Sequence, residues 1–376
     1  MIKWKTYRLG DITIMRNGKK RPNTQGIYPV YGGNGIMDYA DCYNAENAII
    51  VGRVGAYCGN VYQSKGKCWV SDNAISVSAT ELVDSYFLYY LMSSIDFHHH
   101  HIGGAQPLMT QDIIGGFEIF LPSLDEQKRI AGVLGAIDNK IENNRRINAN
   151  LELQAQALFG NLISNSNLEY KPIADIEHLI ETGRRPKGGV ANIANGVPSI
   201  GAENIKGLGK YDYSKTKYIT EEFAQSLKKG FIKGYELLIY KDGGKPGYFI
   251  PNFSIFGEGF PYENMALNEH VFLLDFGDRG YNFFAYFYMQ TEEVMKYLNA
   301  QGSKAAIPGI NRNDVESITI PTIENKTVKE FCVRVEPIIS AILTNAKESN
   351  RLATLRDTLL PKLMNGELSV GDVSVD

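Results

Sequence analysis

The stretch "LPSLDEQKRIAGVLGAIDNKIENNRRINANLELQAQALF", residues 121–159, decides the fold of this chain. Its apolar residues recur at alternating spacings of three and four, which is typical of the seam of a coiled coil. A helix of about 37 residues would be about 55 Å long at 1.5 Å per residue. One small globular domain cannot cover that length, so the stretch predicts a long helix that links two other parts of the chain.

A second stretch of this kind, "IPTIENKTVKEFCVRVEPIISAILTNAKESNRLATLRDTLLPKL", occupies residues 320–363. At an offset of 201 residues the apolar positions of the two stretches coincide, for example Ile130 with Phe331. The spacing therefore predicts two similar helices with one type of seam. The predicted seam positions are Ile130, Leu134, Ile137, Ile141, Asn144, Asn148, Leu151 and Leu158 in the first helix, and Phe331, Val335, Ile338, Ile342, Asn345, Ser349, Leu352 and Leu359 in the second.

The segments beside the helices repeat as well. "YRLGDI…NGKKRP" near the start resembles "KPIADI…TGRRPK" in the second half, and "GGAQPLMTQDI" resembles "SKAAIPGINRNDV". An internal duplication on this scale is a strong signal of a repeated architecture. It predicts a globular domain at 1–122, a central helix at 123–165, a second globular domain at 166–322 and a C-terminal helix at 323–369.

Each globular half combines glycine-rich turns with short apolar runs such as "NAIIVGRVGAYCGNVYQ" and "YELLIYKDGGKPGYFI". These runs predict short strands. The aromatic segments "SYFLYYLMSSI" and "YNFFAYFYMQTEEVMKYL" predict buried helices. We therefore expect an α+β fold with two similar domains, curved and mostly antiparallel sheets, and approximate twofold symmetry.

If the two helices pair through their seams, the second must run antiparallel to the first. The residues that face one another then have numbers that sum to 493, which places Asn144 opposite Ser349 and Asn148 opposite Asn345. Buried amides cost stability but penalise shifted registers. In the alternative arrangement each helix packs on its own domain. Gly132, Gly135 and Pro337 lie early in the helices and are compatible with bends or breaks there.

The composition is that of an ordinary water-soluble protein, with 44% hydrophobic and 22% charged residues in 376. No apolar run is long enough to span a membrane, and the N-terminus lacks the apolar core of a signal peptide. The four cysteines show no CxxC spacing, which indicates free thiols in a cytoplasmic protein. The net charge is −3, yet residues 1–21 and 184–245 each carry an excess of Lys and Arg. Two local basic stretches favour contacts with a polyanion.

The chain resembles the specificity subunits of type I restriction–modification enzymes. The resemblance rests on "LPSLDEQKRIAGVLGAIDNKIENNRRI", "LRDTLLPKLMNGELSV", "YPVYGGNGIMDY…IIVGRVGAYCGNVY…WVSDNAISV" and "GRRPK…VPSIGAENIKG…LLIYKDGGKPG", which together span nearly the whole chain. It implies two target-recognition domains that each read one half of a split double-stranded DNA target. It also implies that the helices fix the gap between the halves and dock two methyltransferase subunits, with two restriction subunits added to the complex.

The resemblance further implies that the chain itself is not catalytic and binds no cofactor, while S-adenosylmethionine, ATP and Mg²⁺ act in the partner subunits. The sequence agrees, since it contains no Pro-Pro dipeptide, no GxxxxGK[ST] loop and no GxSxG motif. The run from His98 to His101 raises the alternative of a metal site. No Cys, Asp or Glu stands near it at convincing ligand spacing, which favours surface or phosphate-contacting histidines and no metal.

DNA contacts should come from Lys and Arg to phosphates, and from Arg, Asn or Gln to base edges. The candidates in the first half are Lys19, Lys20, Arg21, Asn34, Arg53, Tyr57 and Asn60, and those in the second half are Arg184, Arg185, Lys187, Asn204, Lys206, Lys241, Lys245 and Tyr248. The alternative is that the glycine-rich turns are only hairpins and that both tyrosines belong to the core. A different class of function also stays open, in which the chain is a coiled-coil adaptor whose two heads bind proteins.

Overall fold

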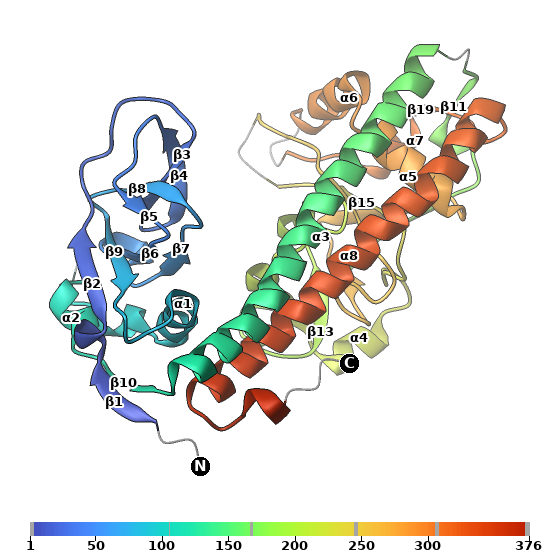
Figure 1. The fold of residues 1–376 in the computed structure, drawn as a ribbon. Helices are drawn as coiled ribbons and strands as arrows, with labels where there is room; N and C mark the ends of the chain where they lie inside the picture. Colours follow the sequence, from blue (N-terminus) through green and yellow to red (C-terminus); the bar gives the residue numbers. More distant parts are fainter. Residues whose placement is uncertain (1–3, 105, 166–167, 244–246, 305–307, 373–376) are drawn as a thin grey trace. The chain divides into compact units, whose positions relative to one another are not determined.

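Two long helices organise the computed structural model, which describes residues 4–104, 106–165, 168–243, 247–304 and 308–372 (Figure 1). The helices are α3 (Leu124–Asn165) and α8 (Lys326–Met364), and both run without a break past Gly132, Gly135 and Pro337. The chain divides into unit 1, made of Met1–Asn139 and Leu352–Asp376, and unit 2, Lys140–Arg351. Each helix therefore contributes residues to both units.

The described part of unit 1 contains three sheets. Strands β1 (Lys5–Arg8) and β10 (Glu118–Leu121) form an antiparallel pair. The four-stranded antiparallel sheet has the order β2-β9-β6-β7, with β2 Thr13–Asn17, β9 Ala74–Ala79, β6 Ile49–Gly52 and β7 Val61–Gln63. The third sheet has the order β4-β3-β8-β5, with β4 Gly35–Ala40, β3 Tyr28–Gly32, β8 Lys67–Val70 and β5 Ala45–Glu46.

The helical elements of unit 1 connect its sheets. The α-helices besides α3 and α8 are α1 (Ser85–Ser94) and α2 (Gln111–Gly115), and the short 3₁₀ turns are Leu9–Asp11, Gly55–Tyr57, Phe97–His100 and Val370–Asp372. Helix α1 begins where the Asp84 carboxylate accepts hydrogen bonds from the backbone N–H groups of Tyr86 and Phe87. This cap satisfies two of the unpaired donors at the helix N-terminus.

Unit 2 repeats this plan. Strands β11 (Tyr170–Pro172) and β19 (Thr319–Pro321) form the antiparallel pair. The four-stranded sheet has the order β12-β18-β15-β16, with β12 Leu179–Thr182, β18 Val271–Asp275, β15 Leu237–Tyr240 and β16 Phe253–Ile255. The third sheet has the order β14-β13-β17, with β14 Lys217–Ile219, β13 Val197–Ile200 and β17 Ala266–Leu267. Its helices are α4 (Glu221–Ser226), α5 (Arg279–Tyr288), α6 (Glu292–Gly302) and α7 (Arg312–Glu316), with 3₁₀ turns at Ile173–Asp175, Ala202–Asn204 and Tyr213–Lys215.

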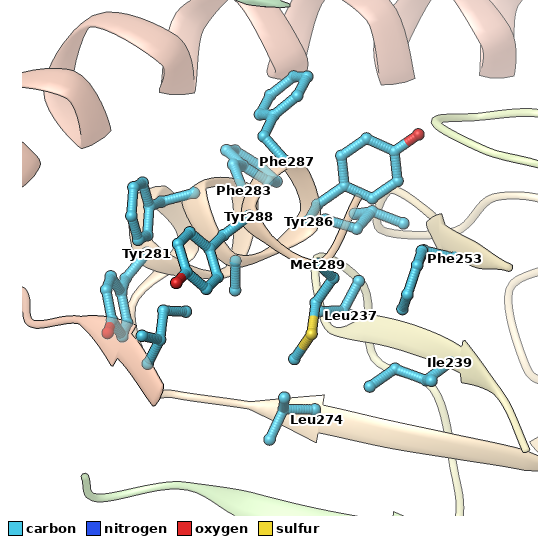
Figure 2. Close-up of a cluster of buried hydrophobic side chains, with 14 of the residues drawn as sticks. Leu237, Ile239, Phe253, Leu274, Tyr281, Phe283, Tyr286, Phe287, Tyr288 and Met289 are labelled. Carbon is cyan, nitrogen blue, oxygen red and sulfur yellow. The ribbon is translucent and has the colours of Figure 1, made fainter. Parts of the chain in front are cut away.

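The main core of unit 2 lies between helix α5 and the four-stranded sheet. Figure 2 shows aromatic side chains of α5, such as Phe283 and Tyr286, above Leu237 and Leu274 of the strands. Phe159 of α3 and Phe331 of α8 join the same core, and their rings contact Phe284. Burial of these large aromatic groups supplies much of the hydrophobic stabilisation of the unit.

The antiparallel orientation of the helix pair is confirmed within each unit. In unit 1, Arg356 Nη1 lies 2.7 Å from Asp138 Oδ1. In unit 2, Asn144 Nδ2 donates to Ser349 Oγ at 3.2 Å. Asn345 Nδ2 likewise donates to Asn148 Oδ1 at 2.8 Å. The last two pairs are those whose numbers sum to 493, so the polar layers meet in the expected register.

The apolar face of α8 is wider than the predicted seam. Ile339 and Leu343, which the seam spacing left out, are 0% and 3% exposed. Both belong to the core that contains α5, as do Phe331, Val335 and Ile342. The helices of unit 2 thus pack on one another and on the globular part of the same unit, so the two arrangements posed as alternatives occur together.

The predicted fold class, α+β with mostly antiparallel sheets and two long antiparallel helices, is confirmed. Among the strands that the structure describes, two pairings are parallel, β3 with β8 and β13 with β17. The aromatic segment of the second half forms two helices, α5 and α6, rather than one. None of the described helices has both the length and the apolar character needed to cross a membrane.

Candidate nucleic-acid interface

In unit 1 the segments that carry the candidate residues Lys19 and Arg53 lie beside the turn between β8 and β9. The backbone N–H of Lys19 donates to Val70 O at 3.0 Å, just before this turn. The N–H of Arg53 donates to Asn73 O at 2.9 Å, and Arg53 Nη1 donates to Asp72 O at 3.5 Å. Backbone hydrogen bonds therefore anchor the segment of Arg53 to the turn at residues 71–73 and the segment of Lys19 to the residues on either side of it, Val70 and Ala74.

Glycines make these close approaches possible. A Cβ at Gly18 would lie 1.9 Å from Ser71 O, and one at Gly52 would lie 2.2 Å from Tyr57 O. No side chain fits at such distances. The turn that carries the exposed Asn34 is held nearby, since a Cβ at Gly33 would lie 3.6 Å from Asn73 O and 3.7 Å from the Cβ of Tyr57.

Tyr57 and Asn60 lie in the turn that follows Arg53, where Gly52 N donates to Asn60 O at 2.8 Å and Asn60 N donates to Tyr57 O at 3.2 Å. Tyr57 is 47% exposed, which excludes the alternative that this tyrosine belongs to the core. Asn60 is exposed, and its Nδ2 donates to Tyr62 Oη at 3.2 Å. His98 reaches this turn as well, through a contact of 3.0 Å between its Nδ1 and Cys58 O.

Residues 107–109 complete the region. Met109 N donates to Arg53 O at 2.8 Å, and Gly55 N donates to Pro107 O at 3.1 Å. Residues 107–109 therefore pack beside Arg53. All seven candidates of unit 1 lie in segments that these contacts connect, with Lys20 and Arg21 directly following Lys19.

In unit 2 the backbone of Lys241 makes the same two hydrogen bonds as the backbone of Arg53, and we call this pair of bonds the backbone frame. The N–H of Lys241 donates to His270 O at 2.9 Å, as Arg53 N does to Asn73 O. Ile310 N donates to Lys241 O at 2.8 Å, as Met109 N does to Arg53 O. Arg53 and Lys241 both follow the third strand of their four-stranded sheet directly. The two units thus place a cationic side chain at equivalent positions.

The segment of Arg184 and Arg185 lies beside this frame. Gly183 N donates to Asn268 O at 3.1 Å, and a Cβ at Gly183 would lie 1.6 Å from Leu267 O. Arg185 Nη1 lies 3.5 Å from Glu269 Oε1. Lys241 Nζ donates to Glu269 O at 3.1 Å and lies 3.5 Å from Asp242 Oδ2. Arg185 and Lys241 are therefore neighbours, although 56 residues separate them in sequence.

One other candidate of unit 2 differs from expectation. Asn204 is 0% exposed, and its Oδ1 accepts a hydrogen bond from Gly201 N at 2.9 Å. Its side chain is part of the framework, so we remove it from the set offered for DNA contact. Lys206 is exposed beside β16, where its N–H donates to Ser254 Oγ at 2.7 Å. Tyr248 is 61% exposed and not part of the core.

The remaining candidates, Arg184 and Lys187, are exposed. Lys245 lies outside the described residues. The contacts of the described residues bring Arg185 and Lys241 together but do not link Lys206 or Tyr248 to them. The candidate surface of unit 2 is thus centred on the ends of β12 and β15 and the start of β18.

Sequence reasoning missed four residues of these surfaces. Asp72 and Asn73 form the turn that anchors Arg53, and Glu269 and His270 form the corresponding turn of unit 2. His270 Nδ1 also pairs with Asp242 Oδ1. The "SDN" and "NEH" triplets between apolar runs mark both turns, but nothing local indicates which strands they meet.

The cysteines and histidines were potential sites of thiol chemistry or metal binding. No cluster of three or more His, Cys, Asp or Glu side chains there could hold a metal ion. In the histidine run, His99 Nδ1 is 2.5 Å from Asp96 Oδ2 and His101 Nδ1 is 2.6 Å from His98 O. Burial raises the pKa of the Cys332 thiol to about 12 and also raises the pKa of Cys58 and Cys68, which disfavours the reactive thiolate.

Comparison with known proteins identifies the relatives of the chain. The family model described as type I restriction modification DNA specificity domain matches residues 1–153. The EcoprrI specificity subunit of Escherichia coli is 29% identical over 147 residues, which are 36% of this chain and 36% of that protein. The MjaIX specificity subunit of Methanocaldococcus jannaschii is 24% identical over 99% of this chain and 90% of its own length.

One solved structure shares the fold along the chain. The S subunit of a type I restriction-modification system from M. genitalium superposes with a TM-score of 0.66 at 17% sequence identity, and 96% of each chain is covered. Residues 1–153 thus match the model of the type I restriction modification DNA specificity domain, and 99% of the chain is similar in sequence to a type I restriction enzyme specificity subunit.

Proposed function

We propose that the chain is a non-catalytic, sequence-specific DNA-binding subunit that reads a target in two separated parts, one with each unit. The observation that carries the proposal is the shared backbone frame around Arg53 and Lys241, with the same two hydrogen bonds in each unit. A basic segment that begins with Lys19 or with Arg184 accompanies each frame. Cations held in equivalent loops suit phosphate and base contacts in two successive stretches of DNA.

The frames do not have identical surroundings. In unit 1 the neighbours are Asp72, Asn73 and the exposed Asn34, whereas in unit 2 they are Asp242, Glu269 and His270. Base edges are distinguished by the pattern of donors and acceptors that face them. We therefore expect the two units to read different half-sites.

The chemistry would reside in partner subunits. We propose that two methyltransferase subunits, which use S-adenosylmethionine, and two restriction subunits, which use ATP and Mg²⁺, are directed to the target by this chain. Exposed apolar side chains on α3, namely Ile147 and Leu153, are candidates for docking such partners.

The test is deletion of the gene from its host, followed by mapping of modified bases across the genome by long-read sequencing. The expected result is one split motif with methylated adenines that disappears on deletion and returns with the full gene. A single uninterrupted motif would contradict the division of labour between the units. An unchanged methylation pattern, with proteins but no DNA bound to the purified chain, would favour the adaptor reading.

A further inference from the structure

Two arginines, Arg21 and Arg185, hold matching places in the two units. Arg21 lies three residues after Gly18, and Arg185 lies two residues after Gly183. These glycines directly follow the first strand of each four-stranded sheet, β2 or β12, and each arginine directly precedes a proline. Proline disfavours the helical conformation of the residue before it. The backbone of both arginines is therefore biased toward an extended shape before any side-chain contact forms.

Each guanidinium is held by a carboxylate from elsewhere in its own unit. Arg21 Nη2 lies 2.8 Å from Asp38 Oδ2 on β4. Arg185 Nη1 lies 3.5 Å from Glu269 Oε1, just before β18. The two carboxylates come from different elements, so the repeated fold alone does not account for the shared pairing. The paired arginine is the feature common to the two units.

Further contacts fix the pair in unit 2. Glu269 Oε1 also lies 3.3 Å from His270 Nε2, whereas the buried Glu269 Oε2 has no hydrogen-bond partner among the described residues. The guanidinium lies against the turn at Gly189, where a Cβ would be 3.2 Å from Arg185 Nη2. Gly189 has a φ of +80°, which glycine adopts without strain. The carboxylate and the turn thus hold the guanidinium from two sides.

The guanidinium groups remain accessible nonetheless. The side chains of Arg21 and Arg185 are 49% and 52% exposed. An ion pair through one terminal nitrogen leaves N–H donors on the other two nitrogens. By contrast, the neighbouring Lys20 and Arg184 are exposed and form no ion pair with any described residue. Each unit therefore presents one oriented guanidinium beside unrestrained positive charge.

We infer that Arg21 and Arg185 each recognise a guanine in the half-site that their unit reads, and that Asp38 and Glu269 are positioning residues for them. The inference rests on the proposed function. A guanidinium fork matches O6 and N7 of guanine in the major groove, and this match requires a defined orientation of the fork. A phosphate contact requires only nearby positive charge, which Lys20 and Arg184 supply.

The carboxylates could instead neutralise the arginines and keep them from DNA, and the two readings predict opposite results. If Glu269 orients Arg185, removing its charge weakens the preference for one base. If Glu269 neutralises Arg185, removing its charge tightens binding to every duplex and leaves base preferences as they were. Glu269→Gln keeps the shape of the side chain and therefore separates the two.

The experiment uses the full chain, purified from its host with any subunits that accompany it, and a pool of duplex DNA with randomised sequence. Arg185→Lys and Arg184→Lys form a matched pair, since both retain the positive charge and differ only in which guanidinium group is removed. Sequencing of the bound DNA gives the preference at each position, and a fixed non-target duplex measures the general affinity. Arg21→Lys and Lys20→Arg form the corresponding pair in unit 1.

Arg185→Lys is expected to lower the preference for guanine at one position of one half-site by roughly 5- to 150-fold, with unchanged affinity for the non-target duplex. Arg184→Lys should leave all base preferences unchanged, and Glu269→Gln should reproduce the loss at the same position. Arg21→Lys should act only on the other half-site. Equal effects of Arg184→Lys and Arg185→Lys, or no change at any guanine, would overturn the inference.

The wild-type chain separates this outcome from a failure of the proposed function. If the wild-type chain enriches a split motif, the proposed function stands, and the results with the variants then test only the recognition of guanine by Arg21 and Arg185. If it enriches no motif at all, the proposed function itself fails. Thermal melting of every variant verifies that a lost preference does not reflect an unfolded unit.

Discussion

Arg356 of α8 and Asp138 of α3 form an ion pair with 2.7 Å between Nη1 and Oδ1, and the other oxygen of Asp138 accepts a hydrogen bond of 2.6 Å from Tyr90 Oη on α1. One carboxylate thus joins three helices of unit 1. The side chains of Arg356 and Asp138 are less than a third exposed. A charged hydrogen bond at such a site contributes more than one at the open surface.

Arg356→Ala is expected to lower the free energy of unfolding by about 1–3 kcal/mol, because Asp138 would lose its charged partner while it stays partly buried. Urea denaturation followed by circular dichroism measures the change. Arg351→Ala, which removes an exposed arginine one turn earlier in α8, serves as the control. Equal effects of the two substitutions would contradict a specific role of the ion pair.

Glu348 gives the helix pair of unit 2 a dependence on pH. The hydrogen bond from Asn144 and the ion pair with Lys140 hold the pKa of this carboxyl below its usual value. A pKa that is lower in the folded state stabilises the fold above the unfolded pKa, and this contribution is lost as pH falls through the folded pKa. Since Glu348 is 42% exposed, only a few tenths of a kcal/mol are expected.

The expected observation is that Glu348→Gln destabilises the protein near neutral pH and that its stability converges with that of the wild type below about pH 4. Melting temperatures of both proteins across a pH series measure this. Asn144→Ala, which removes the larger cause of the shift, should make the difference at neutral pH smaller. A difference in stability between the two proteins that grows toward acid pH would contradict a lowered pKa of Glu348 in the folded state.

Gly183→Ala is expected to displace the segment of Arg184 and Arg185, since the added Cβ would lie 1.6 Å from Leu267 O. Both stability and DNA binding should fall. Gly132→Ala is the matched control, because a Cβ there meets nothing within 4 Å and the residue lies inside α3. Gly132→Ala should stabilise the helix by about 1 kcal/mol. Thermal melts compare the two, and a tolerated Gly183→Ala would contradict the tight backbone approach.

Arg53→Ala and Lys241→Ala should each weaken DNA binding and lower the salt slope of the association constant by about one, which is the loss of roughly one phosphate contact. Titrations of duplex DNA at several salt concentrations measure this slope. Lys326→Ala removes a 90% exposed lysine at the start of α8 and should leave the slope unchanged. If only one of the two substitutions lowers the salt slope, the frames around Arg53 and Lys241 are not equivalent in function.

Asn204→Ala tests the reassignment of this residue to the framework. Loss of its hydrogen bond to Gly201 N should cost about 0.5–1.5 kcal/mol of stability. The salt slope of DNA binding should not change, because a fully buried side chain makes no phosphate contact. A reduced slope with unchanged stability would return Asn204 to the DNA-contact set.

The sequence predicted the long helices, their duplication and their antiparallel register. These properties depend on the spacing of apolar and polar residues along each helix, which tertiary contacts do not alter. Asn148 faces Asn345 because helix geometry fixes which residues share a seam once the direction is known. The glycine-rich turns with their basic residues were also visible, since turn chemistry is local.

Burial and pairing within the globular parts were decided only by the tertiary structure. In sequence, Asn204 resembles the other polar loop residues, yet it lies in a 3₁₀ turn and its side chain is buried. Arg53 and Lys241 are 188 residues apart, whereas their partners Met109 and Ile310 are 201 apart, so no single offset reveals the equivalence. Arg185 meets Glu269 across 84 residues of sequence because the antiparallel order of β12 and β18 brings the end of one strand to the start of the other. Such contacts depend on how strands meet in space, which local sequence patterns do not encode.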